Sequence, residues 1–95
     1  MAGYVIVDIE VLDPVAYEGY KKLAQDSLAL YGGEYLVRGG PTETVEGDWS
    51  PHRLVILRFA TPARAREWLD SPEYAPALAI RRRAARSTMV LAEGH

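Results

Sequence analysis

The 95-residue sequence contains no cysteine. This absence excludes disulfide bonds, thiol catalysis and thiolate metal sites. It also fits a reducing compartment, so we expect a cytoplasmic protein. Histidine is nearly as scarce, because His52 is the only imidazole apart from the terminal His95. One such residue beside scattered acids is thin support for zinc, iron or haem, and we therefore expect no metal and no cofactor.

Long apolar runs and an excess of positive charge are also missing. No stretch approaches the roughly 20 apolar residues of a membrane span, and the first residues, MAGYVIVDIEV, lack the basic start of a signal peptide. The net charge is −2, which gives no general attraction to nucleic acid or to an anionic membrane. The basic run of residues 81–86 has no interleaved aromatic residues and fits the solvated last turn of a helix. We expect neither nucleic acid nor membrane as a partner.

Alternating apolar residues are present in four segments, and they predict four strands. The segments are residues 4–11, 34–38, 53–60 and 87–93. The segment TETVEGDW (42–49) is also β-leaning and could form a small ribbon that turns at Gly47-Asp48. A chain of this length forms one domain, which we assign to residues 1–95.

Pairs of a capping residue and a proline predict where the helices begin. Asp13-Pro14 and Thr61-Pro62 are two such pairs, each followed by a helical stripe of apolar residues. Ser71-Pro72 is a third pair, but Pro76 would disrupt a helix running through it, so a turn should precede a short helix over 77–86. The resulting order β-α-β-β-α-β predicts an α+β ferredoxin-like fold, with helices on one face of a four-stranded antiparallel sheet and the first and third strands central.

The stretch YGGEYLVRGG (31–40) holds two glycine pairs that resemble a phosphate-binding loop at first sight. The Lys-Ser/Thr of a Walker loop is missing, however, and there is no G-x-G-x-x-G motif. Gly32 instead stands where a helix needs a left-handed C′ residue. Gly39-Gly40, followed by Pro41, is typical of a strand end. Both pairs therefore have a structural interpretation.

Strand parity predicts one dry face and one mixed face of the sheet. The dry face carries Val5, Val7, Ile9, Tyr35, Val37, Val55, Leu57 and Phe59. The mixed face carries Tyr4, Ile6, Leu36, Leu54 and Ile56 together with Asp8, Glu10, Arg38 and Arg58. The mixed face could simply be solvated, but it is very apolar for a surface in water. We favour a second copy of the chain packed against it, as in an isologous homodimer.

The charged residues of the mixed face are candidate site residues. Asp8 and Arg58 lie on neighbouring central strands, so we expect them to be in contact, with Arg38 further out beside Gly39-Gly40. Such a pair could only set the register of the dimer, or it could belong to a ligand site. In that site Arg38 would hold an anion, because a guanidinium binds a carboxylate with two hydrogen bonds.

Aromatic residues are the other candidates for a pocket lining. Tyr20 and Trp68 have helical spacing and fit core packing better. Tyr74 lies in the turn after Ser71-Pro72, and turns often rim binding sites. We therefore predict Tyr74 as a pocket residue.

Several of these segments together resemble the DUF1330 family of dimeric α+β barrel proteins. The carrying motifs are DPVAYEGY (13–20), YGGEYLVRGG (31–40), VEGDW (45–49), RLVILRF (53–59) and SPEY (71–74). The resemblance implies a ferredoxin-like fold and a homodimer with packed sheets, and it implies no established reaction. Its wider relatives include cofactor-free oxygenases, isomerases, haem-degrading enzymes and small-ligand binders, so activity does not follow from the fold.

Two hypotheses about function remain open. In the first, the protein is a homodimer that binds a small acidic or aromatic molecule, or is a cofactor-free enzyme, with a pocket formed by Asp8, Arg38, His52, Arg58 and Tyr74. In the second, it is a non-catalytic dimeric domain whose charged groups only set the pairing of the subunits. Density for a ligand beside Arg38 would favour the first hypothesis, and a filled core would favour the second.

Overall fold

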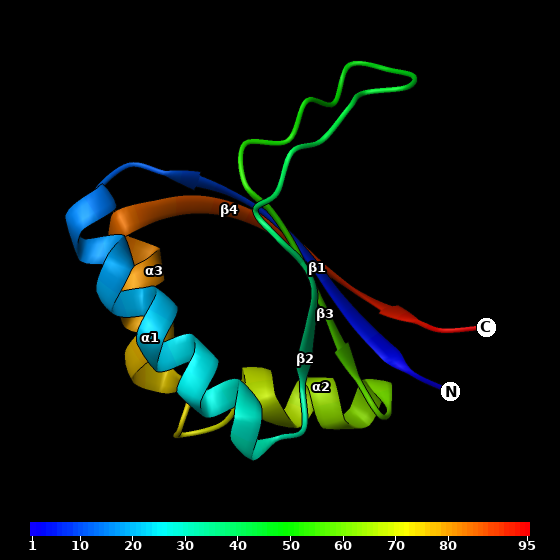
Figure 1. Ribbon diagram of the computed structural model, residues 1–95. Coiled ribbons are helices and arrows are strands. Elements are labelled where there is room, and N and C mark those ends of the chain that lie inside the picture. The colour runs from blue at the N-terminus through cyan, green and yellow to red at the C-terminus, as the bar shows by residue number, and fades with distance from the viewer.

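Four antiparallel strands form one sheet in the order β2-β3-β1-β4. The computed structural model describes residues 1–95 (Figure 1). The strands are β1 (Gly3–Val11), β2 (Glu34–Arg38), β3 (Leu54–Phe59) and β4 (Ala85–Glu93). The first and third strands are central, and the ferredoxin-like architecture predicted from the sequence is confirmed.

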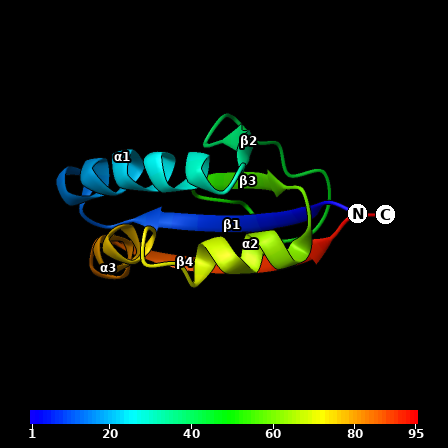
Figure 2. The same cartoon turned by 90° about the horizontal axis from the view of Figure 1, so that it is seen from below.

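Three helices cover one face of this sheet (Figure 2). They are α1 (Pro14–Leu30), α2 (Pro62–Leu69) and α3 (Ala75–Ala84). The two predicted caps are confirmed, since Asp13 Oδ1 accepts from the backbone N–H of Ala16 at 3.2 Å and Thr61 Oγ1 accepts from that of Arg64 at 3.0 Å. None of the three helices has both the length and the hydropathy needed to cross a bilayer.

The third capping pair closes a turn, as predicted. Ser71 Oγ accepts a hydrogen bond from the backbone N–H of Tyr74 at 3.1 Å, and α3 begins directly after this turn. Pro76 lies in the first turn of α3, where its missing N–H is not needed. The helix ends at Ala84, earlier than predicted, because Ala85 and Arg86 already pair with β1 as strand residues.

The first glycine pair ends α1 in a Schellman motif. Gly32 has a φ of +71°, and its N–H donates to Ala29 O, while the N–H of Gly33 donates to Leu28 O. These are the two bonds that define the motif when the residue after the C-cap is left-handed. The predicted role of Gly32 is therefore confirmed.

A β-bulge in β2 corrects the predicted parity of this strand. Tyr35 pairs with Leu57, but Val37 pairs with Ile56 and Arg38 with Val55. Residues opposite each other in a ladder share a face, so one extra residue at Leu36 turns Val37 to the outer face and Arg38 to the helix face. The predictions that Val37 lies on the dry face and Arg38 on the mixed face are wrong for this reason.

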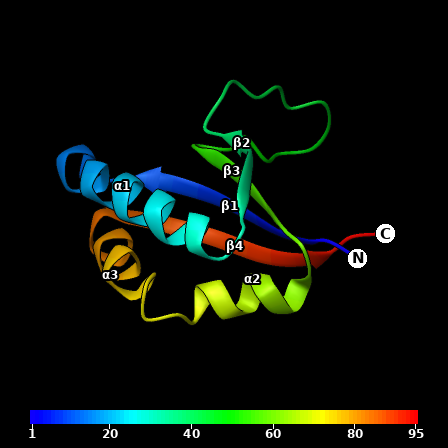
Figure 3. The same cartoon turned by 60° about the horizontal axis from the view of Figure 1, so that its bottom comes forward.

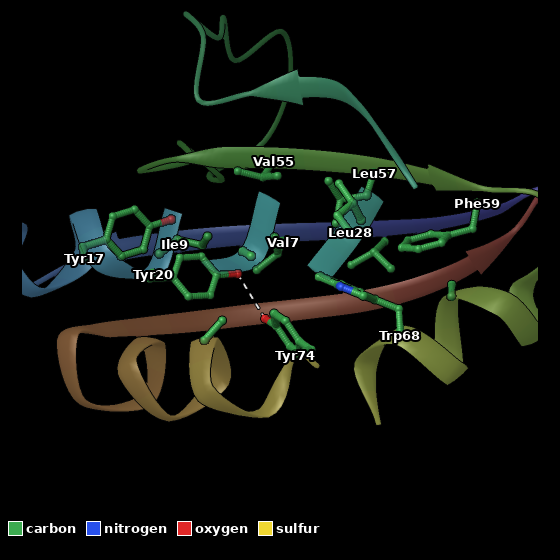
Figure 4. Packing of buried hydrophobic residues seen from close by; sticks show 14 of the residues in the cluster. Val7, Ile9, Tyr17, Tyr20, Leu28, Val55, Leu57, Phe59, Trp68 and Tyr74 are labelled. Atoms are coloured by element: carbon green, nitrogen blue, oxygen red, sulfur yellow. Dashed lines mark hydrogen bonds between the residues drawn. The ribbon is translucent and has the colours of Figure 1, made fainter. Parts of the chain in front are cut away.

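The core lies between the helices and the inner face of the sheet (Figure 4). Val5, Val7, Ile9, Leu57 and Phe59 are buried there, as strand parity predicted. Trp68 and Tyr20 are buried as well, and the Trp68 indole N–H donates to Ser27 Oγ at 3.0 Å. Their predicted role in core packing is thus confirmed.

Residues 39–53 form a long loop between β2 and β3, called the arm below. The predicted ribbon over 42–49 is wrong, because the arm contains no strand. A turn at Gly47, with a φ of +89°, lies near its tip, and Thr44 Oγ1 donates to Trp49 O at 2.8 Å. The arm stands out from the sheet on the side away from the helices (Figures 1 and 3).

Candidate functional site

A narrow pocket lies between α1 and the inner face of the sheet. Its free volume is about 20 Å³, which is room for roughly one water molecule. Most of its lining is apolar or aromatic and includes Val7, Ile9, Tyr17, Tyr20, Tyr35, Val55 and Leu57. The pocket is thus an apolar slot, with aromatic rings from both α1 and β2.

The only charged residues that line this pocket are Lys21, Arg38 and Arg53, and all three are cations. Lys21 Nζ lies 3.0 Å from Glu18 Oε1 and is partly neutralised. Arg38 Nη2 donates to the neutral Gln25 Oε1 at 2.9 Å. No carboxylate lies within ion-pair distance of either arginine. The pocket therefore offers two unneutralised guanidinium groups to an anion.

Arg53 was not among the candidate residues predicted from the sequence, although strand parity would have placed it on the inner face. It precedes β3 at the same parity as Val55, Leu57 and Phe59, so its side chain starts toward the core. Its guanidinium Cζ lies 5.8 Å from the centre of the Tyr17 ring. Burial raises the pKa of the Tyr17 hydroxyl, and the positive charge of Arg53 opposes that rise.

Asp8 and His52 lie together, but on the opposite face of the sheet. Asp8 Oδ1 accepts from the backbone N–H of His52 at 2.8 Å, and Asp8 Oδ2 accepts from the indole N–H of Trp49 at 2.9 Å. The Trp49 hydrogen bond, followed by that of the His52 backbone, holds the pKa of Asp8 below its usual value, although partial burial acts in the other direction. Asp8 thus fastens the base of the arm to β1.

The His52 side chain is 59% exposed. Its Nδ1 lies 3.8 Å from Asp8 Oδ1 and its Nε2 lies 3.7 Å from Glu10 Oε2. These three side chains do not form a group with the geometry of a metal site. His52 is therefore an open surface imidazole between two carboxylates.

The predicted contact between Asp8 and Arg58 is wrong. Asp8 lies opposite Leu54 in the β1–β3 ladder, whereas Arg58 lies opposite Tyr4, four positions further along β3. Arg58 Nη1 instead donates to Glu34 Oε1 on β2 at 3.1 Å, and this bond raises the pKa of the guanidinium. Opposite charges do pair on the outer face, but with other partners than expected.

Tyr74 does not rim the pocket. It is completely buried, and its hydroxyl lies 3.0 Å from that of Tyr20 (Figure 4). Its ring centre lies 4.1 Å from that of Trp68, and Arg81 Nε donates to its hydroxyl at 3.4 Å. The turn before α3 folds inward, so Tyr74 is not part of the pocket beneath α1, and it lines instead a separate, open hollow together with Leu69, Arg81 and Met89. The five candidates are therefore divided among the pocket (Arg38), the outer face (Asp8, His52 and Arg58) and the core (Tyr74).

Comparisons with known proteins agree with this architecture. The family model described as a domain of unknown function, DUF1330, matches residues 2–95. A protein of unknown function from Rhodopseudomonas palustris has a similar structure, with a TM-score of 0.75, 18% identity, and coverage of 99% of this chain and 82% of the other. A search of the curated proteins gave no match.

Two further solved structures are similar over nearly the whole chain. SnoaB, a cofactor-independent oxygenase from Streptomyces nogalater, has a TM-score of 0.71 and 17% identity, with 99% of this chain and 93% of the other covered. A dimeric ferredoxin-like protein of unknown function from Jannaschia sp. has a TM-score of 0.69 and 17% identity, with 99% and 100% covered. At these identities the likeness shows the fold alone.

Proposed function

The chain belongs to the DUF1330 family, whose function is unknown, and from its own geometry we propose that it is a homodimer in which each subunit binds a small acidic or aromatic molecule in the pocket beneath α1. The observation that carries this proposal is the lining of the pocket. Its interior is apolar and aromatic, and its only charged residues are cations. Such a combination suits a molecule with an apolar body and an acidic group.

The pocket supports binding more directly than acid–base catalysis. No carboxylate and no imidazole line it. Its hydroxyl groups belong to tyrosines, and burial raises the pKa values of Tyr17 and Tyr35, which keeps both hydroxyls protonated and unavailable as bases at neutral pH. A cofactor-free reaction, as the description of SnoaB suggests for that protein, would therefore draw on binding and orientation of the substrate.

The outer face of the sheet supports the homodimer. Val37, Ile56, Ile6 and Val90 lie side by side across β2, β3, β1 and β4, because each pairs with the next in the ladders. Val90 is 55% exposed in the single chain. We call these four residues the outer strip. A continuous apolar strip across a whole sheet is typical of a face that a partner covers.

A non-catalytic dimeric domain is the second candidate function. The observation that favours it is the small free volume of the pocket, about 20 Å³. Lys21 and Arg38 line both this pocket and an open hollow on the surface, so they form the mouth of the pocket. A ligand larger than a carboxylate group would have to displace their side chains. Under this candidate, Arg38 stabilises α1 against β2 through its bond to Gln25 and has no ligand.

Mass spectrometry of small molecules carried by the native protein, combined with the variant Arg38→Met, distinguishes the two candidates. If the pocket binds an acidic ligand, Arg38→Met should retain less of it, by tenfold or more for one lost charged contact. Its melting temperature should stay close to that of the wild type, because the bond to Gln25 is exposed. The control is Arg83→Met, which removes an exposed arginine on α3.

The opposite result would support the second candidate. A lower melting temperature for Arg38→Met, together with no ligand carried by the wild-type protein, would contradict small-molecule binding.

A further inference from the structure

We propose that Arg53 is the main anion-binding residue of the pocket and that its ligand is a carboxylate attached to an aromatic or apolar body. This inference rests on the proposed function, namely that the pocket beneath α1 binds a small molecule. It goes further by naming the residue that recognises the acidic group and the chemical class of that group.

The first observation is an unsatisfied donor. Among all buried side-chain nitrogen and oxygen atoms, only Arg53 Nε and Ser87 Oγ have no hydrogen-bond partner. A buried charged donor without a partner is costly, since native proteins satisfy nearly all such groups. Arg53 also has no carboxylate within ion-pair distance. An anion bound beside the guanidinium would neutralise its charge, and it would also accept from the Nε–H if the side chains packed against this nitrogen move aside.

The second observation separates Arg53 from the other two cations of the pocket. Lys21 is paired with Glu18 at 3.0 Å. Arg38 already donates to Gln25, and its guanidinium stacks on the Tyr35 ring with Cζ 4.2 Å from the ring centre. Arg53 alone has an unused buried donor. Arg38 then acts as a second, outer contact at the mouth.

The third observation is that neighbouring residues hold Arg53 in place. Its carbonyl oxygen accepts from the backbone N–H of Ile9 at 2.9 Å, which fixes the backbone directly before the start of β3. Gly39, with a φ of +70°, lies against the guanidinium, and a Cβ at this position would overlap Arg53 Nη1. The second glycine pair therefore leaves room for this arginine in addition to ending β2.

The shape of the pocket favours a carboxylate. The Nε–H and one Nη–H of a guanidinium lie in one plane and match the two oxygens of a carboxylate. The free volume of about 20 Å³ is close to that of one small polar group. The apolar residues and tyrosine rings that line the pocket would contact the body of the ligand after the exposed side chain of Arg38 and that of Lys21 move aside to admit it.

Nitrogen NMR of the arginine side chains tests the inference directly. Benzoate is the probe, and benzyl alcohol is its neutral counterpart. Benzoate should shift the Nε–H resonance of Arg53 with saturation, and Arg53→Met should weaken benzoate binding at least tenfold. Benzyl alcohol should bind to the wild type more weakly than benzoate does. Its affinity should be the same for the wild type and for Arg53→Met, because it carries no charge for Arg53 to bind. Arg83→Met, far from the pocket, should bind benzoate as the wild type does.

The possible results separate this inference from the proposed function. If benzoate and benzyl alcohol shift the methyl resonances of Val7 and Val55 alike, and the Arg53 Nε–H does not respond, the pocket binds ligands but the role of Arg53 is wrong. If neither probe shifts any lining residue, both proposals fail. If phenyl phosphate binds tightly through Arg53 and benzoate does not, the assignment to carboxylates is overturned. If Arg53→Met does not fold, benzoate binding is measured on Arg53→Lys instead. Weaker binding to this variant, together with a shifted Nε–H resonance of Arg53 in the wild type, supports the role of Arg53, and unchanged binding without such a shift contradicts it.

Discussion

The four glycines of residues 31–40 have four different surroundings. Gly32 is left-handed, but a Cβ built on it would have nothing within 4 Å. Gly33 packs so closely that a Cβ would overlap Leu28 and lie 2.9 Å from Phe59 Cε1. Gly39 is left-handed and lies against Arg53, while Gly40 is open on all sides. The cost of replacing Gly32 is therefore a backbone cost alone, which makes it a clean test.

Replacing Gly32 with valine should lower the free energy of unfolding by about 1 kcal/mol or more, because a β-branched residue is strained at positive φ. Urea denaturation measures this change. The matched control is Gly40→Val, where the backbone is not left-handed and the space is open. Equal stability of the two variants would show that the end of α1 does not depend on a left-handed residue.

Residue-level predictions from the sequence succeeded where the determinants are local. The caps of Asp13 and Thr61 and the left-handed Gly32 depend on neighbours within four positions, so the chain itself specifies them. The partner of Asp8 could not be found in this way. Trp49 is 41 positions from Asp8 in the sequence and lies in the irregular arm. The periodic patterns that predict strands and helices give no information about a contact made from such a segment.

At the level of elements, one extra residue in β2 changes what the pocket contains. The bulge at Leu36 exchanges the faces of Val37 and Arg38, which completes the outer strip and brings a guanidinium to the pocket. A single sequence specifies strand parity only up to such a bulge, because the pairing partner decides where the ladder shifts. For that reason the strand was predicted correctly while the side of Arg38 was not.

A buried pair of tyrosines joins α1 to the turn that precedes α3. The Tyr20 and Tyr74 hydroxyls lie 3.0 Å apart, and their ring centres are 6.4 Å apart in an edge-on arrangement. Burial, followed by the influence of Tyr74, raises the pKa of Tyr20 well above its usual value. The folded protein therefore keeps this proton at a pH where the unfolded chain loses it.

Tyr20→Phe should destabilise the protein near pH 8 by about 1 kcal/mol, the net contribution of one hydrogen bond. In the wild type, the raised pKa of Tyr20 makes stability fall above the unfolded pKa of roughly 10, by about 1.4 kcal/mol per pH unit. Tyr20→Phe has no hydroxyl to titrate at this position, so its free energy of unfolding does not fall for this reason. The difference in stability between the wild type and the variant should therefore disappear within about one pH unit above pH 10. Urea denaturation from pH 8 to 11 measures the difference in stability between the two proteins, and a difference that stays constant would contradict a raised pKa of Tyr20.

At the level of the whole molecule, the two faces of the sheet differ in how far other parts of the chain cover them. The inner face is covered by three helices, whereas the outer strip and Leu36, which is 50% exposed, are open in the single chain. The arm adds Val45 and Trp49, which are 89% and 56% exposed. Loops of this length without strands or helices are uncommon in compact domains and usually have a function.

A second copy would use the arm as well as the strip. Trp49 borders a hollow on the outer face together with Ile6, Asp8, Thr88 and Val90. Because the arm extends beyond this face (Figure 3), a partner packed on the outer strip would lie beside the arm.

The ferredoxin-like order of the elements was predictable from the succession of strand and helix patterns, and so was the apolar outer face. The arm was not, since its contacts on β1 are made by side chains outside any regular element.

The homodimer can be tested at the centre of the outer strip. Ile56 pairs with Ile6 on one side and Val37 on the other, so Ile56→Asp would bury an unpaired carboxylate in a sheet-to-sheet interface. Such burial costs several kcal/mol. Sedimentation at micromolar concentration should give twice the chain mass for the wild type and either a monomer or an unfolded chain for the variant. Val15→Asp, at a position on α1 that is 86% exposed, introduces the same charge and should remain a dimer. A wild-type protein that is folded and monomeric at this concentration would show that the outer strip is simply solvated.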